Sequence, residues 1–206
     1  MSYRQYKEYT AVRMPYSAIS FGGSTWSQFL IESNTLCSSF TTPDSFDAVN
    51  PPVTTAGIVF DKDFICRTPF DKRMRVEGPV WGDVCFMLET NNTNSSYYVS
   101  LSEMDITLTV LKADGTERTL IAEHEVYPVD GTVGNVTCLG TGSLVTRTEG
   151  LHFTTTVDGY IEPDELLVLN VKLYGLRSTS SANLKMYLLC SSSDADISIS
   201  LPFVEV

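Results

Sequence analysis

The sequence predicts an all-β protein, an antiparallel β-sandwich of the jelly-roll type with an irregular N-terminal arm. Stretches in which every second residue is apolar recur along the chain, which is typical of strands with one buried face. Turn signals separate these stretches about every 8–12 residues, as in sandwiches and jelly rolls. The chain shows no convincing long helix and no internal repeat.

The segment 160–174 carries the clearest strand pattern. Pro163 and Asp164 turn the chain into it. Apolar residues then occupy one face, while Asn170, Lys172 and Tyr174 occupy the other. The expected buried face consists of Leu167, Leu169, Val171 and Leu173.

Other strands are expected before and after this segment. A hairpin is predicted at Asp114-Gly115, because this dipeptide joins two alternating runs. Gly78-Pro79 is expected to end one strand, and Asp158-Gly159 to turn the chain. Residues 127–150 are rich in Gly and Thr and predict a long loop with one weak strand near 136–139. The remaining strands are expected at 56–60, 73–77, 80–88, 104–111, 116–126, 152–157, 184–190 and 197–203.

Two parts of the chain are predicted, an aromatic-rich arm at 1–54 and the sandwich domain at 55–206. The arm combines tyrosines with a few basic residues, a composition that favours docking onto a protein surface. An intrachain role for the arm is an equal alternative. The expected contact residues are Tyr3, Tyr6, Tyr9, Tyr16, Trp26 and Phe29.

Composition and charge narrow the function classes. Hydrophobic residues make up 43% of the 206 residues, which is enough for a substantial core. The net charge of −11 disfavours binding to nucleic acid or to anionic membranes. No apolar run reaches the roughly 18 residues that span a bilayer. The first residues lack the apolar core of a secretory signal, so either the protein is made and kept in a cytoplasm, which we expect, or a signal was removed.

No cofactor or metal site is expected. The five cysteines have no short spacing, which argues against zinc and against a disulfide framework. The pairs Asp61/Asp63 and Asp194/Asp196 could offer oxygen ligands to calcium, but acidic loop tips are common in an acidic protein.

No catalytic site is expected either. His124 lies between Glu123 and Glu125, which alternate to the opposite side of the strand and cannot readily orient its ring. His152 lies at an expected strand start, and no serine has a Gly-x-Ser-x-Gly context. Glu123 and Glu125 could form a glycosidase pair, but no aromatic platform accompanies them.

The turn at Tyr160-Ile161-Glu162-Pro163-Asp164-Glu165, the Asp114-Gly115 hairpin and the weakly charged surface resemble the small jelly-roll proteins of tailed-virus particles, the capsid cement or decoration proteins. The resemblance implies a non-enzymatic virion component, assembled in the host cytoplasm. It would bind other virion subunits, such as a major capsid protein, and would form a homo-oligomer.

The alternative function is a carbohydrate-binding module for host recognition, which would require aromatic residues exposed together. The candidate residues are Trp81, Tyr97, Tyr98 and Tyr127.

Overall fold

The computed structural model describes most of the chain after residue 48. The described residues are 20–21, 24–32, 35–37, 44–45, 49–65, 70, 73–92, 94, 96–127, 129, 137–181, 183–190 and 197–204. Side chains are described from Val49 onward, with Cys190, Ser198 and Val204 excepted.

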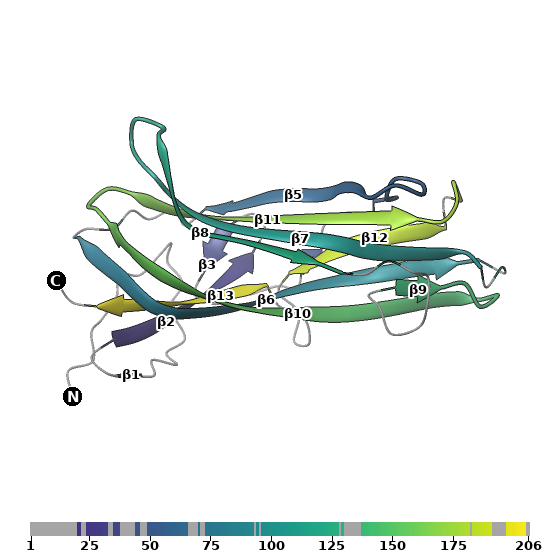
Figure 1. The fold of residues 1–206 in the computed structure, drawn as a ribbon, viewed down its shortest axis with the longest axis horizontal. Coiled ribbons are helices and arrows are strands. Elements are labelled where there is room, and N and C mark those ends of the chain that lie inside the picture. The colour runs from purple at the N-terminus through teal and green to yellow at the C-terminus, as the bar shows by residue number, and fades with distance from the viewer. Residues whose placement is uncertain are drawn as a thin grey trace.

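The fold is an antiparallel β-sandwich, which confirms the predicted class. Figure 1 shows two layers of long strands. One layer contains β10, β6, β12 and β13, and the other contains β5, β11, β7 and β8. Among the described residues, no helix is long and apolar enough to cross a membrane. The strands are β1 (Ser20–Phe21), β2 (Ser24–Glu32), β3 (Thr35–Cys37), β4 (Asp44–Ser45), β5 (Gly57–Ile65), β6 (Met74–Asn91), β7 (Tyr98–Leu111), β8 (Glu117–Val126), β9 (Thr137–Leu139), β10 (Leu144–Ile161), β11 (Leu166–Arg177), β12 (Leu184–Cys190) and β13 (Ser198–Val204).

The first layer is built around β6. One edge of this strand pairs with β10 over 18 residues. The other edge pairs with β12 and then with β13. The predicted strand end at Gly78-Pro79 is therefore wrong. Residues 77–80 of β6 instead face only residues 201–202 of β13, and such a bulge tolerates a proline without an N–H.

The structure also corrects the expectations for β10. Residues 144–150, which we expected in a loop, belong to this strand, as do Asp158 and Gly159. Asp158 lies opposite Glu77, and Gly159 lies opposite Val76. Pairing along β6 thus overrides the local turn preference of Asp-Gly. The weak strand expected near 136–139 is confirmed as β9.

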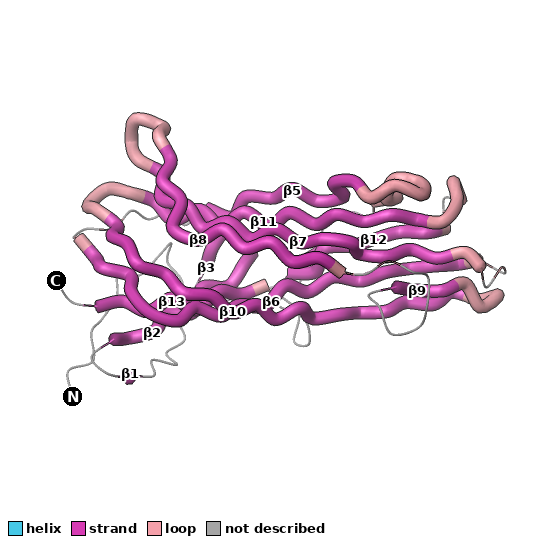
Figure 2. Tube along the Cα trace, viewed as in Figure 1, coloured by secondary structure: helices cyan, strands magenta, loops and turns pink. Residues whose placement is uncertain are grey.

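The predicted hairpin at Asp114-Gly115 is confirmed between β7 and β8. The Lys112 N–H donates to the Thr116 carbonyl at 2.9 Å. Gly115 has a φ of +82°, a conformation that favours glycine. Figure 2 shows this turn projecting beyond the layers, while the other described loops gather at the two ends of the sandwich.

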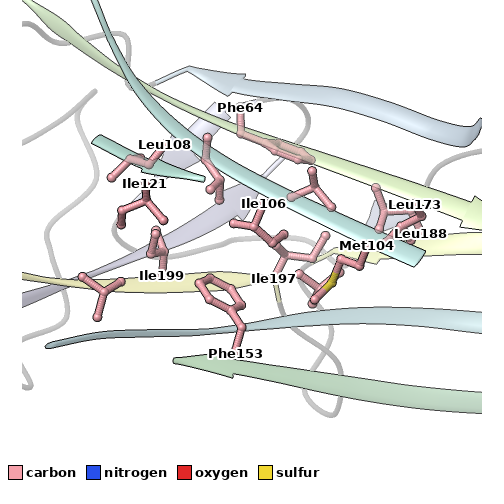
Figure 3. Close-up of a cluster of buried hydrophobic side chains, with 14 of the residues drawn as sticks. Phe64, Met104, Ile106, Leu108, Ile121, Phe153, Leu173, Leu188, Ile197 and Ile199 are labelled. Atoms are coloured by element: carbon pink, nitrogen blue, oxygen red, sulfur yellow. The ribbon is translucent and has the colours of Figure 1, made fainter. Parts of the chain in front are cut away.

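The core lies between the two layers. Figure 3 shows side chains from both layers meeting there, with Phe153 of β10 pointing toward Ile106 of β7. The predicted buried face of β11 is confirmed, because Leu167, Leu169, Val171 and Leu173 are all buried. The largest fully buried side chains are Phe64, Phe86, Phe203, Leu88, Leu101, Met104, Ile106, Leu108 and Ile161.

Strands β1 to β4 fall within the segment predicted as an arm. Strand β2 pairs with β13, and its Trp26 and Phe29 lie opposite Pro202 and Ile199. The other expected contact residues lie outside the described residues, and the contact role of all six stays a prediction. They are Tyr3, Tyr6, Tyr9 and Tyr16. The division into parts 1–54 and 55–206 also stays a prediction.

Two leucines test the core assignment. Leu108→Ala should lower the free energy of unfolding by about 2–5 kcal/mol, because a fully buried side chain leaves a cavity. Leu144→Ala should change it by less than about 0.5 kcal/mol, because Leu144 is exposed. Urea unfolding followed by circular dichroism measures both. Equal effects of the two substitutions would contradict the assigned core.

Candidate functional site

Both histidines pair with an aspartate directly opposite on the neighbouring strand. His124 Nδ1 lies 2.6 Å from Asp105 Oδ1, across β8 and β7. His152 Nδ1 lies 2.9 Å from Asp83 Oδ1, across β10 and β6. In each ring the bond to Asp uses Nδ1, so Nε2 faces away from the carboxylate. The His124 ring is oriented by a partner on the opposite strand of the hairpin, which the sequence prediction missed, and not by Glu123 or Glu125.

The Asp105–His124 pair belongs to a polar row across the second layer, formed by Asp61, Lys172, Asp105 and His124 in register. Lys172 Nζ lies 3.2 Å from Asp61 Oδ2. The Tyr174 hydroxyl donates to Asp105 Oδ2 at 2.8 Å. Asp105 therefore contacts His124 on one neighbouring strand and Tyr174 on the other, and the row forms a connected polar network on the sheet surface.

The polar row shifts the protonation of its members. The hydrogen bond to Asp105 raises the pKa of His124 above its usual 6.5, and nearby Glu103 and Glu125 raise it further. The hydrogen bond from Asn170 lowers the pKa of Asp61. His124 is therefore more readily protonated than an isolated histidine.

The two aspartates considered for calcium do not lie in a loop. Asp61 and Asp63 belong to β5, and both accept a hydrogen bond from Asn170 Nδ2, at 2.9 Å and 2.8 Å. Asp194 and Asp196 lie outside the described residues. In the part of the chain that the structure describes, no three His, Cys, Asp or Glu side chains are grouped to hold a metal ion.

The Asp83–His152 pair lies beside a cysteine on the outer face of the first layer. Cys85 is directly opposite Gly150, one row from Asp83 and His152 on the same face. Cys85 is not disulfide-bonded. A Cβ built on Gly150 would lie 3.6 Å from Cys85 Sγ. We call this place, formed by Cys85, Gly150 and His152, the Cys85 notch.

The aromatic residues considered for carbohydrate binding do not form a platform. Tyr97 and Tyr127 pack against the core. Burial raises the pKa of Tyr127 to about 12. Trp81 lies on β6 of the first layer, whereas Tyr98 begins β7 of the second.

The proposed glycosidase pair is equally unsupported. Glu123 and Glu125 lie opposite Ile106 and Met104, and neither lies beside an aromatic residue of the adjacent strand.

Comparison with known proteins gives a likeness of fold only. No family model matches the sequence, and no curated protein is significantly similar to it. An aminopeptidase from the marine sediment archaeon Thaumarchaeota archaeon aligns with a TM-score of 0.54 and 9% identity, over 88% of this chain and 37% of that chain. A CocE/NonD family hydrolase from Staphylococcus aureus aligns with a TM-score of 0.50 and 11% identity, over 92% of this chain and 39% of that chain. The chain thus spans less than two-fifths of either hydrolase.

These matches overturn two predictions. The shared folds belong to hydrolases, which contradicts the prediction of a virion structural protein and the prediction of no enzymatic activity. The features behind both predictions, alternating strands, tight turns and a weakly charged surface, occur in enzyme sandwiches as well. The resemblance to tailed-virus proteins, the virion location and the subunit partners stay predictions that no observation tests.

The Asp105–His124 pair predicts a pH-dependent stability. A pKa raised by folding gives stability that is fully present below the unfolded value of 6.5 and is lost as pH rises through the folded value. His124→Gln should therefore lower the urea midpoint more at about pH 5.5 than at about pH 9. Added 1 M salt should make this pH-dependent difference in urea midpoint smaller. At 1 M salt the Debye length is about 3 Å, so the attraction between exposed charges is largely screened. If His124→Gln lowers the urea midpoint equally at both pH values, the prediction is wrong.

Proposed function

We propose that the chain is the β-sandwich part of a hydrolase, in which the Asp83–His152 pair moves the proton during hydrolysis. The observation that carries the proposal is the pair itself, bonded through Nδ1 at 2.9 Å on two adjacent strands. The fold likeness to two hydrolases over most of this chain supports the reaction class.

The geometry fits general acid–base chemistry. Asp83 fixes the orientation of the imidazole and stabilises the imidazolium that forms. Nε2 can then accept a proton from the attacking group and return it to the leaving group. Both side chains are about half exposed, so a substrate can approach the ring (His152 59%, Asp83 47%).

The second pair fits this role less well. Asp105 is shared with Tyr174, and the surrounding carboxylates favour the protonated form of His124. A raised pKa leaves less of the ring in the neutral form that can act as a base. The Asp83–His152 pair, in contrast, has a thiol one row away.

Matched histidine variants test the proposal. The protein and its His152→Gln and His124→Gln variants are assayed against p-nitrophenyl esters and aminoacyl p-nitroanilides. His152→Gln should lower kcat/KM by about 10²–10⁴-fold, while His124→Gln should leave it nearly unchanged. Circular dichroism controls for folding. The proposal fails if the wild-type protein releases no chromophore above the buffer rate, or if His152→Gln matches it.

A further inference from the structure

We propose that Cys85 is a nucleophile served by His152, and that the missing side chain at Gly150 opens the path by which a small acyl donor reaches Cys85 Sγ. The inference deepens the proposed function, because it names the attacking atom in the same site. It rests on three separate observations, namely the direction of Cys85, the adjacent His–Asp pair and the gap at Gly150.

Cys85 points to the outer face of the first layer. Its neighbours Val84 and Phe86 are fully buried in the core, and successive side chains of a strand point to opposite faces. Its closeness to the side-chain position of Gly150 agrees with this direction. Cys85 as a whole is 8% exposed, so access to its thiol depends on what lies beside it.

Gly150 interrupts a row of side chains along the outer face of β10. The row consists of Thr146, Thr148, Gly150, His152 and Thr154, which share one face of the strand. Apart from Gly150 itself and its two chain neighbours, the only described atom within 4 Å of a Cβ built on Gly150 is Cys85 Sγ. A side chain at position 150 would therefore lie directly against the thiol.

Folding gives no reason for glycine at this position. The contact of 3.6 Å with Sγ is ordinary van der Waals contact, and the backbone of Gly150 is not in the positive-φ region that favours glycine. Glycine within a strand weakens it, and it often marks a place where another group approaches closely. A ligand at Sγ would explain the gap.

The reaction at this site is acyl transfer followed by hydrolysis. His152 Nε2 takes the thiol proton, and Sγ attacks the carbonyl carbon of an ester or thioester. A bond forms from Sγ to carbon, the bond from carbon to the leaving oxygen or sulfur breaks, and the leaving group takes the proton from His152. Water then attacks the thioester, gives its proton to His152, and the thiol is restored with release of the acid.

The strand register brings Cys85 and His152 onto the same face as diagonal neighbours. Diagonal neighbours on an antiparallel pair have Cα atoms about 7–8 Å apart, with their side chains closer. Cys85 and His152 are such neighbours, because Cys85 faces Gly150 and His152 follows two residues later.

Thiol alkylation tests the inference without any substrate. The protein is treated with iodoacetamide from about pH 6 to pH 9, and the modified cysteines are identified by peptide mass spectrometry. Cys138 is the matched control, since it too is buried and outside any disulfide, and burial raises the pKa of its thiol. Cys85 should react at least about tenfold faster than Cys138 at pH 7.

Three variants identify the cause of that reactivity. His152→Gln should slow alkylation of Cys85 about tenfold, whereas His124→Gln should leave it unchanged. Gly150→Val should also slow it about tenfold, because a β-branched residue suits the strand and fills the notch. If Cys85 reacts no faster than Cys138, or if His152→Gln and Gly150→Val both leave its rate unchanged, the inference is overturned.

A Cys85→Ala variant separates this inference from the proposed function. Loss of ester hydrolysis in Cys85→Ala supports the inference. If hydrolysis survives in Cys85→Ala but is lost in His152→Gln, Cys85 is not the nucleophile, and the proposed hydrolase function still holds. If alkylation of Cys85 depends on His152 but the protein hydrolyses none of the substrates, Cys85 is a reactive thiol served by His152, and the proposed hydrolase function is wrong.

Discussion

The pairing of β6 with β10 over 18 residues is the constraint on which the rest of the structure depends. Inward residues of β6 such as Val84 and Phe86 fill the core, and the residues between them face outward. The same alternation therefore anchors the first layer and presents Asp83 and Cys85 beside β10. A slip of one residue in this pairing would turn the outward-facing side chains toward the core. Burial of the apolar side chains therefore fixes the register, and the register fixes which residues form the Cys85 notch.

The two His–Asp pairs differ in how far the sequence leads to them. Asp105 and His124 flank the predicted hairpin, but the β7–β8 register shifts by one residue between Leu108 and Thr109, and this bulge brings Asp105 opposite His124. Asp83 and His152 are 69 residues apart, and their pairing depends on a non-local register that no turn specifies. The predicted hairpin therefore places the first pair to within one residue, whereas no local pattern indicates the second.

The fold class and parts of the inward faces of β7 and β11 could be predicted, because aliphatic residues alternate and are buried over residues 106–110 and 167–173. The first half of β10 could not. Its inward positions include Arg147 and Glu149, and its outward positions include two threonines and Gly150, a composition that favours a loop by local propensity. Pairing with β6 decides its conformation. The functional predictions failed for a different reason, because jelly-roll features identify an architecture that many functions share.

The position of β13 in the sheet has a consequence for how the chain reaches this fold. This strand, at residues 198–204, lies between β6 and β2, both of which precede it by more than a hundred residues. During synthesis on a ribosome, part of the edge of β6 must wait unpaired until nearly the whole domain has emerged. Such long-range closure is intrinsically slow, and an uncovered strand edge invites pairing with other chains.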